Sequence, residues 1–304
     1  KFGEKIKVRR VLKNLNEMKA EQENYDQWAW LYDQTMGPEY GQEKWKALQK
    51  MILPKLADGA KLLDLCCGTG PLIPPLIQLG YQVTGLDASN EMLAFARKKA
   101  PEADFVYEDA RHFQLKERFD GVISTSASLN HMPTLQDLEQ VFAQVYASLR
   151  PGGLFLFDMN HPQQMQKWWR GTPTEGNILK HCAWMVTPRY DVAKKQGAFQ
   201  VTLFRRPASS GVTLRERLQR PFYNLLRRSR FIGLRLKLIQ QFHLAEPRWA
   251  RSDIDFPVIG FDLDLVIEAL SKAGFCKIQV QTIDQRLTVD ADHSAYFSCE
   301  RSDV

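Results

Sequence analysis

The feature that most constrains the fold is a short apolar segment that runs directly into a glycine-rich turn. Residues 60–66 are mostly apolar, Gly68 and Gly70 follow, and residues 71–80 have a helical pattern that Gly80 closes. Glycines are needed at such a turn because the backbone bends sharply and a ligand can approach it without a Cβ in the way. A buried strand, a glycine turn and a helix in this order predict the first unit of a doubly wound α/β sheet.

The alternation of strand and helix continues along the first half of the chain. We expect helices over 23–56, broken at Gly37-Pro38, and over 89–99 and 134–149, with Ser89 as an N-cap. Strands are expected at 81–87, 103–107, 119–125 and 154–158. This spacing predicts a parallel sheet whose two faces are covered by helices.

The pattern changes after residue 160. An antiparallel hairpin is expected at 181–188 and 197–206, then a basic insert, then a helix over 262–273 that Gly274 closes, and strands at 277–283 and 294–300. We therefore expect four segments. They are an N-terminal arm (1–22), a cofactor-binding core (23–160), an inserted substrate and lid segment (161–261), and a C-terminal helix and strands that complete the core sheet (262–304).

Composition excludes several classes of protein. Apolar residues make up 44% and charged residues 25%, which is ordinary for a globular protein. No apolar run approaches the roughly 18–20 residues that span a bilayer, and the first residues have no apolar core of a signal peptide. The five cysteines are irregularly spaced, which argues against a disulfide framework and a zinc site. We expect a cytoplasmic protein without a bound metal.

Three acidic residues stand near the carboxyl ends of predicted strands, where ligands bind in such sheets. Asp87 ends the second strand and can accept hydrogen bonds from both hydroxyls of a ribose, and Asp109 follows the third strand. Asp64 precedes Gly68 by four residues and would repel the diphosphate of a nicotinamide cofactor, which also favours a small residue where Ile73 stands. A cofactor with an ammonium and a sulfonium is attracted by Asp64 instead. Asp87 and Asp109 could each also be simple helix caps.

Four motifs in order resemble the class I S-adenosylmethionine-dependent methyltransferases. They are Asp-Leu-Cys-Cys-Gly-Thr-Gly at 64–70, Asp87, Glu-Asp-Ala at 108–110, and Leu-Arg-Pro-Gly-Gly at 149–153. The resemblance covers about residues 22–160 and resumes at 262–300. It implies a Rossmann-like, seven-stranded, mostly parallel sheet with an antiparallel last strand, and S-adenosyl-L-methionine as the cofactor, with S-adenosyl-L-homocysteine as the product.

The resemblance also implies a set of cofactor-binding residues. Asp64, Gly68 and Gly70 would surround the methionyl part, Asp87 would bind the ribose, and Asp109 and Ala110 would lie against the adenine. The complete set of expected cofactor contacts is Tyr25, Asp64, Cys66, Gly68, Gly70, Asp87, Ala88, Met92, Asp109, Ala110 and Ser126.

Residues 25–33 resemble the helix that covers the cofactor in small-molecule members of this family. There a tyrosine hydroxyl approaches the methionyl carboxylate or the substrate, which makes Tyr32 a candidate catalytic residue. The aromatic side chains of this segment could equally be core residues.

Residues 124–133 should line the mouth where the methyl group is transferred. They lack the Asn/Asp-Pro-Pro-Tyr tetrad typical of enzymes that methylate amines of nucleic-acid bases, and they lack a Pro-Cys nucleophile. His131 is the candidate general base because imidazole titrates near neutral pH, although it could also bond to the start of the next helix. Asp158, at the end of the fifth strand, could orient a substrate amine or hydroxyl, or it could hold the following loop.

The basic charge of the chain is concentrated in one segment. Residues 205–251 contain twelve Arg or Lys and two acidic residues, a local net charge of +10 in a chain of net charge +6. Apolar residues recur at helical spacing over 213–241, and Pro221 and Gly233 are expected to divide this stretch. Three interpretations stay open: a lid over the substrate, a segment that rests on an anionic membrane, and, least supported, a nucleic-acid groove.

These patterns predict methyl transfer to a small organic acceptor of hydrophobic or acidic character. The alternative is a non-catalytic protein that binds S-adenosylmethionine as a regulator or scaffold. The expected catalytic residues are His131, Tyr32 and Asp158. The expected partner is a small-molecule acceptor, nucleic acid is not expected, and residues 213–241 are the candidate contact with an anionic membrane.

Overall fold

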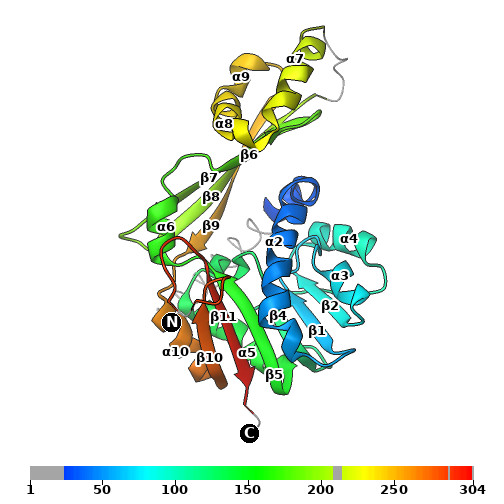
Figure 1. The fold of residues 1–304 in the computed structure, drawn as a ribbon, viewed down its shortest axis with the longest axis vertical. Helices are drawn as coiled ribbons and strands as arrows, with labels where there is room; N and C mark the ends of the chain where they lie inside the picture. The colour runs from blue at the N-terminus through cyan, green and yellow to red at the C-terminus, as the bar shows by residue number, and fades with distance from the viewer. Residues whose placement is uncertain (1–23, 208–213, 287, 303–304) are drawn as a thin grey trace, which may run out of the picture. The chain divides into compact units, whose positions relative to one another are not determined.

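The structure, a computed structural model, describes residues 24–207, 214–286 and 288–302. The predicted N-terminal arm (1–22) lies outside these residues. The described residues form two compact units: a core unit, up to Pro162 and again from Ile259, and an inserted unit, Gln163–Val258. Each unit has its own sheet and its own apolar core. We describe the two units separately (Figure 1).

The core unit is built on a seven-stranded sheet. Its strands, in the order β3-β2-β1-β4-β5-β11-β10, are β3 (Asp104–Tyr107), β2 (Gln82–Asp87), β1 (Lys61–Leu65), β4 (Phe119–Ser124), β5 (Leu149–Met159), β11 (Ala295–Arg301) and β10 (Phe275–Gln281). The pairs from β3 to β5 are parallel, and β11 is antiparallel to both of its neighbours. The predicted mostly parallel sheet with an antiparallel last strand is confirmed.

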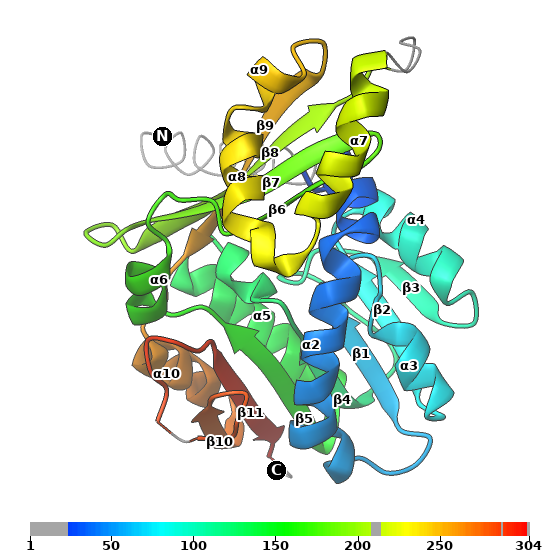
Figure 2. The same cartoon turned by 45° about the horizontal axis from the view of Figure 1, so that its top comes forward.

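Helices cover both faces of this sheet (Figure 2). Helices α2 (Met36–Met51), α3 (Ile73–Gln78) and α4 (Asn90–Lys99) contribute to one apolar cluster, and α5 (Leu135–Ser148) and α10 (Leu263–Ala273) to the other. Adjacent residues of β1 divide between the clusters: Leu62 belongs to the first and Leu63 to the second. This alternation is what a strand buried on both faces requires.

Two capping predictions are confirmed, and one predicted helix break is wrong. Ser89 accepts a hydrogen bond from the Met92 amide at the start of α4, and Gly274 ends α10 in the left-handed conformation. The break expected at Gly37-Pro38 lies instead at Thr35, between a helix over residues 24–34 and α2. Pro38 is tolerated because it stands in the first turn of α2, where its missing N–H has no helical partner to lose.

The inserted unit contains a four-stranded sheet in the order β6 (Glu175–Ile178), β7 (Cys182–Asp191), β8 (Gln196–Arg205) and β9 (Ala250–Ile259). Strands β7 and β8 form the predicted antiparallel hairpin, whereas β6 and β9 were not predicted. The short helix α6 (Pro162–Trp168) precedes this sheet. The unit thus has a complete small sheet and not an isolated hairpin.

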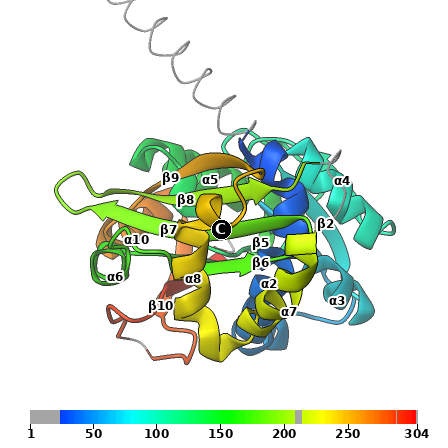
Figure 3. The same cartoon turned by 90° about the horizontal axis from the view of Figure 1, so that it is seen from above.

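Helices α7 (Leu214–Leu226), α8 (Ile232–Gln240) and α9 (Phe242–Ala245) complete the inserted unit. Side chains of all three join a cluster with residues of β6, β7 and β8, and Figure 3 shows α7 and α8 beside β6. The predicted breaks at Pro221 and Gly233 are wrong, because Pro221 lies inside α7 at an exposed position and Gly233 is the second residue of α8. Helix α7 ends instead at Leu226, before the short helix η3 (Ser229–Phe231). Among the described helices, none has the length and hydropathy needed to cross a bilayer.

Candidate functional site

The turn after β1 is held in an unusual backbone conformation. Cys66, Gly68 and Gly70 have φ values of +59°, +55° and +67°, a region that side chains with a Cβ rarely adopt. Glycine is also required at position 70 for packing, because a Cβ there would lie 3.0 Å from the Cβ of Ala96 on α4. The turn therefore brings β1 close to α4 and presents backbone, not side chains, at the carboxyl end of the sheet.

Asp87, at the end of β2, fixes this turn from the neighbouring strand. One oxygen accepts a hydrogen bond from the Gly68 amide at 2.8 Å, and the other accepts one from the Ser89 amide at 2.9 Å. Burial raises the pKa of Asp87 to about 6, although these hydrogen bonds oppose the shift. Because a carboxylate offers about four acceptor positions, Asp87 can hold the turn and still have acceptor capacity for a ligand.

Asp64 is a second carboxylate beside the turn, and it is buried. It lies in β1, opposite Gly85 of β2 and Ile123 of β4, with 2% of its surface exposed. Burial, together with the charge of Asp87, raises the pKa of Asp64 to about 8. Among the described residues, neither Asp64 nor Asp87 forms an ion pair with a basic side chain. A buried acid and a half-buried acid without a paired cation make this end of the sheet receptive to a positively charged ligand.

The helix over residues 24–34 is tied to the ends of two strands. Asp26 accepts a hydrogen bond from the Ser89 hydroxyl at 2.5 Å, next to the end of β2. The Tyr25 hydroxyl lies 3.0 Å from Nε2 of His131, beyond β4. Tyr32 is hydrogen-bonded to Ser126, and burial raises the pKa of Tyr32 to about 12, so it stays protonated at neutral pH. The structure thus brings Tyr25, Tyr32, Ser126 and His131 together at one edge.

The segment after β4 is strained at this edge. Ser126 and Ala127 are consecutive non-glycine residues with φ values of +63° and +56°. They lead into the short helix η2 (Ser128–His131), which places His131 at its end. Non-glycine residues held in the left-handed region cost of order 1–3 kcal/mol each, and such strain concentrates at functional sites.

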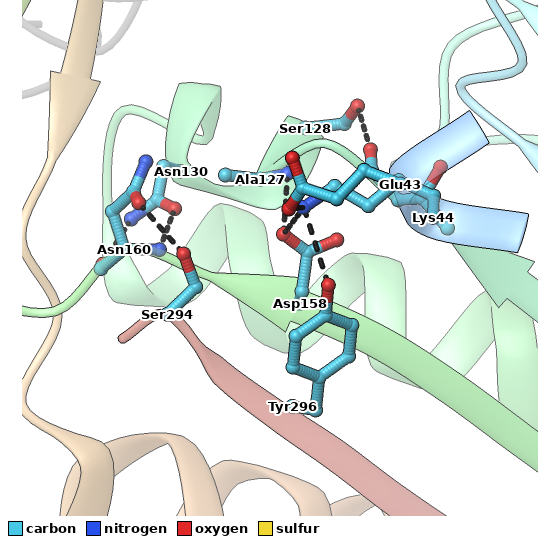
Figure 4. A network of polar contacts seen from close by, with 10 residues as sticks. Glu43, Lys44, Ala127, Ser128, Asn130, Asp158, Asn160, Ser294 and Tyr296 are labelled. Carbon is cyan, nitrogen blue, oxygen red and sulfur yellow. Dashed lines mark hydrogen bonds and ion pairs between the residues drawn. The ribbon is translucent and has the colours of Figure 1, made fainter. Parts of the chain in front are cut away.

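Asp158 lies beneath this strained segment, and its partner is a lysine that the sequence analysis did not identify. Oδ2 of Asp158 lies 3.3 Å from Nζ of Lys44 and accepts a hydrogen bond from the Ala127 amide at 3.2 Å. Lys44 also donates to the hydroxyl of Tyr296, the residue opposite Asp158 on β11. Figure 4 shows the three side chains converging, with Glu43 on the outer side of Lys44.

The ion pair in this network is buried, with Lys44 8% and Asp158 1% exposed. Burial alone would lower the pKa of Lys44, but the charge of Asp158 and contact with Tyr296 raise it above its ordinary value. The Asp158 carboxylate therefore supports the loop and Lys44. Its predicted role in orienting a substrate stays a prediction.

The residues after β3 form a compact acid–base cluster. Asp109 accepts three hydrogen bonds from Arg111, one from its amide at 2.8 Å and two from its guanidinium at 2.9 and 2.6 Å. Burial would raise the pKa of Asp109, but Arg111 lowers it, so the carboxylate stays charged. Ala110 is buried beside it, Met92 is buried at the start of α4, and Ala88 is exposed after β2. Whether these residues touch an adenine stays a prediction.

Asn130 has a structural role that its position in the mouth did not suggest. It is fully buried, donates to the carbonyls of Asn160 and Ile259, and accepts from the Asn160 amide. These bonds join the segment after β4 to the end of β5. A buried asparagine with its hydrogen bonds satisfied in this way fixes the loop that carries His131.

Comparison with known proteins identifies a family domain that includes the glycine turn. Residues 62–153 match the methyltransferase domain family. Over 140 residues the chain is 34% identical to a methyltransferase candidate of Bacillus subtilis, YqeM, covering 45% of this chain and 55% of that protein. Over 133 residues it is 28% identical to the dTDP-3-amino-3,4,6-trideoxy-alpha-D-glucopyranose N,N-dimethyltransferase of Streptomyces venezuelae, covering 44% of this chain and 52% of that enzyme. The chain spans about half the length of the curated relatives it matches.

The fold is also found among solved structures. A S-adenosylmethionine-dependent methyltransferase from Clostridium acetobutylicum superposes with a TM-score of 0.66 at 16% identity, over 91% of this chain and 99% of that one. The predicted class I methyltransferase fold is confirmed by this likeness and by the matched domain.

Proposed function

Since residues 62–153 are a methyltransferase domain of the class I fold, we propose that this chain transfers a methyl group from S-adenosyl-L-methionine to a small organic acceptor. The observation that carries the proposal is a pair of carboxylates, the buried Asp64 and the half-buried Asp87, at a turn of glycine backbone. The cofactor supplies an electrophilic methyl group on a sulfonium, so the protein's tasks are to bind, to align and to remove a proton.

The charge of the turn fits this cofactor. Loss of hydration raises the pKa of both the buried Asp64 and the half-buried Asp87. An ammonium or sulfonium placed nearby offsets the cost of ionising them, whereas a diphosphate increases it. Asp87 keeps acceptor capacity for ribose hydroxyls while it holds the Gly68 amide. The chain's own electrostatics thus favour a cationic nucleoside over a nucleotide.

His131 and Tyr25 form the proposed proton-removing group. The Tyr25 hydroxyl and Nε2 of His131 are 3.0 Å apart, so a proton from the acceptor can reach the imidazole directly or through the hydroxyl. An acceptor amine must lose a proton before or after its lone pair attacks the methyl group. Tyr32, with its raised pKa, acts as a hydrogen-bond donor and not as a base. Asp158 would act through Lys44 and the 126–127 backbone.

An amine on a small molecule is the acceptor class that we place first. The Streptomyces venezuelae relative is named for the dimethylation of a dTDP-linked 3-amino sugar. Residues 124–133 lack the tetrad of nucleic-acid amine methylation, in accord with a small acceptor. The alternative of a non-catalytic cofactor-binding protein predicts the same turn but requires no His131–Tyr25 pair.

Calorimetric titration with S-adenosylhomocysteine tests the cofactor site. We expect binding, and we expect Asp87→Asn to weaken it by roughly 1.5–3 kcal/mol, because a charged hydrogen-bond acceptor is lost. Asp104→Asn is the matched control, since Asp104 stands at the opposite end of the adjacent strand β3. Equal affinities in the two variants, or no binding by the unmodified protein, would contradict the site.

A second experiment separates catalysis from binding alone. The protein is incubated with S-adenosylmethionine and a panel of nucleotide-linked amino sugars, other primary amines, phenols and carboxylic acids, and products are identified by mass spectrometry. A methylated amine supports the proposal, and a methylated phenol or acid moves it to that acceptor class. Cofactor binding without any methylated product would favour the non-catalytic alternative.

A further inference from the structure

The inserted unit contains a pocket that is lined by none of the residues of the core-unit site. The pocket has a volume of about 260 Å³, and its lining comes from segments far apart in the sequence. They are the turn between β6 and β7, the end of β8, helix α7, and the residues between α9 and β9. Pockets that hold drug-sized ligands are roughly 300–1,000 Å³, so this one suits a small ligand or one part of a larger ligand.

The rim of the pocket is strongly basic. Four of its ten lining residues are cationic: Lys180, Arg206, Arg220 and Arg227. Among the described residues, Lys180, Arg220 and Arg227 form no ion pair with any carboxylate, although ion pairs are frequent elsewhere in the chain. These three side chains share one rim without a carboxylate paired to any of them, so they repel one another, and a bound anion removes that cost.

The pocket wall supplies aromatic surface and one buried carboxylate. Tyr223 donates a hydrogen bond to Glu246 at 3.1 Å, and both side chains are buried, so Glu246 is anchored within the wall. Trp249 packs against Phe242 with 5.2 Å between ring centroids. This wall belongs to the apolar cluster of the inserted unit and does not depend on the rim cations for its packing.

Trp249 gives a second indication of a ligand. Its side chain is 9% exposed, and its indole Nε1 has no hydrogen-bond acceptor among the described residues. A buried N–H without a partner costs about 1–3 kcal/mol. Trp249 lines the pocket, so a ligand oxygen that reaches this N–H would satisfy it.

We propose that this pocket binds a phosphate-type oxyanion, with Arg220, Arg227 and Lys180 as its charged contacts and the Trp249 indole as a neutral donor. Arginine guanidinium groups suit this role because they form paired hydrogen bonds to phosphate oxygens. The aromatic wall leaves room for an uncharged part of the same ligand. The site is distinct from the methyl-transfer machinery of the core unit and does not rest on it.

Calorimetry with inorganic pyrophosphate and with uridine diphosphate, at low salt, tests the proposal. We expect both to bind, and we expect Arg227→Glu to weaken binding about tenfold or more, because a charge-assisted contact becomes repulsive. Arg228→Glu is the matched control: it is the adjacent exposed arginine, carries the same change and does not line the pocket. Trp249→Phe keeps an aromatic ring and removes the N–H, and should weaken binding about two- to tenfold.

The pattern of losses decides the outcome. Loss in Arg227→Glu and Trp249→Phe, with Arg228→Glu unchanged and all variants folded by circular dichroism, supports the pocket. If uridine diphosphate binds more tightly than pyrophosphate, the aromatic wall contacts the rest of a nucleotide. If the two bind equally, the site recognises the diphosphate alone. Equal losses in Arg227→Glu and Arg228→Glu would show only general attraction to a basic surface, and would overturn the proposal, as would the absence of binding at low salt.

Discussion

The core unit and the inserted unit differ in how their charges are arranged. In the core unit, charged groups at the carboxyl ends of the strands are buried or half-buried and held by specific partners, as in the Asp87 contacts with two amides and the Lys44–Asp158 pair. In the inserted unit, most of the basic residues described between α7 and α9 are exposed. Five of the ten exposed large hydrophobic residues of the described chain also lie there: Phe222, Leu225, Ile232, Leu234 and Leu244. Buried charge with fixed geometry is suited to chemistry, whereas exposed charge beside apolar surface is suited to capturing a partner.

The largest expected difference between the two units comes from replacing one histidine in each, His131 in the core unit and His243 in the inserted unit. We expect His131→Ala in the core unit to lower turnover by roughly 10²–10⁴, because the proposed base is removed, with little change in S-adenosylhomocysteine affinity. His243→Ala, at an exposed position of α9, should leave turnover unchanged. Steady-state kinetics with the acceptor found in the panel measure both. Normal turnover by His131→Ala would leave His131 as a structural partner of Tyr25 and return proton removal to another group.

The next largest effect is expected from the buried ion pair. Lys44→Met leaves the Asp158 carboxylate buried without its cation, and breaking such a pair costs about 3–5 kcal/mol of unfolding free energy. Lys46→Met changes an exposed residue of the same helix and should cost little. Adding Asp158→Asn to Lys44→Met removes the stranded charge, so urea unfolding should show a partial recovery. A double variant less stable than Lys44→Met would contradict a charge-based account of this network.

These contacts show what could and could not be predicted from the sequence. The turn at 66–70, the cap at Ser89 and the left-handed Gly274 were predictable because each depends on local backbone geometry that few residue types allow. The partner of Asp158 was not, because Lys44 lies 114 residues away and an α2 lysine carries no local signal of burial. A buried acid in a central strand does indicate that some cation must reach it.

The missed strands and the wrongly predicted helix breaks also have physical causes. Strands β6 and β9 were missed because β6 has only four residues and β9 has four exposed residues at its start, so neither shows a clear alternation. Pro38 and Pro221 were given too much weight as helix breakers. Proline costs nothing in the first turn of α2, and at the exposed position of Pro221 a carbonyl left without its helical partner can be hydrated.

The titration of Asp64 should make the unfolding free energy depend on pH, whereas an acid of the inserted unit should not have this effect. The pKa of Asp64 is raised to about 8 in the folded chain, so the folded state binds a proton that the unfolded state releases above its ordinary pKa. Stability without ligand should therefore fall as pH rises toward 8, by up to about 1.4 kcal/mol per pH unit. Asp64→Asn should flatten this slope, measured by urea unfolding at pH 5 to 8, whereas Asp253→Asn in the inserted unit should not.

Cofactor binding gives the same test a second readout. A cationic ligand lowers the pKa of Asp64 and Asp87, so S-adenosylhomocysteine, which carries an ammonium, should release protons when it binds near pH 7. Calorimetry in buffers of different ionisation enthalpy measures that release. No proton release by the unmodified protein would place the ammonium away from these carboxylates.

The smallest expected effect concerns residues 213–241, for which a lid over the substrate and a contact with an anionic membrane are both open interpretations. Each basic residue near such a surface contributes about 1 kcal/mol, and the contribution fades as salt shortens the Debye length to about 10 Å at 0.1 M. Sedimentation with phosphatidylglycerol vesicles should therefore show binding at low salt that weakens at high salt. Arg228→Glu and Arg230→Glu should each reduce it severalfold, while Lys46→Glu, an exposed change in the core unit, should not. Leu234→Gln should reduce binding at both salt concentrations, because burial of an exposed leucine in the interface is not screened. If the protein does not bind vesicles at low salt, the exposed leucines do not serve membrane contact. The interpretation that then remains for this surface is a lid over a soluble acceptor.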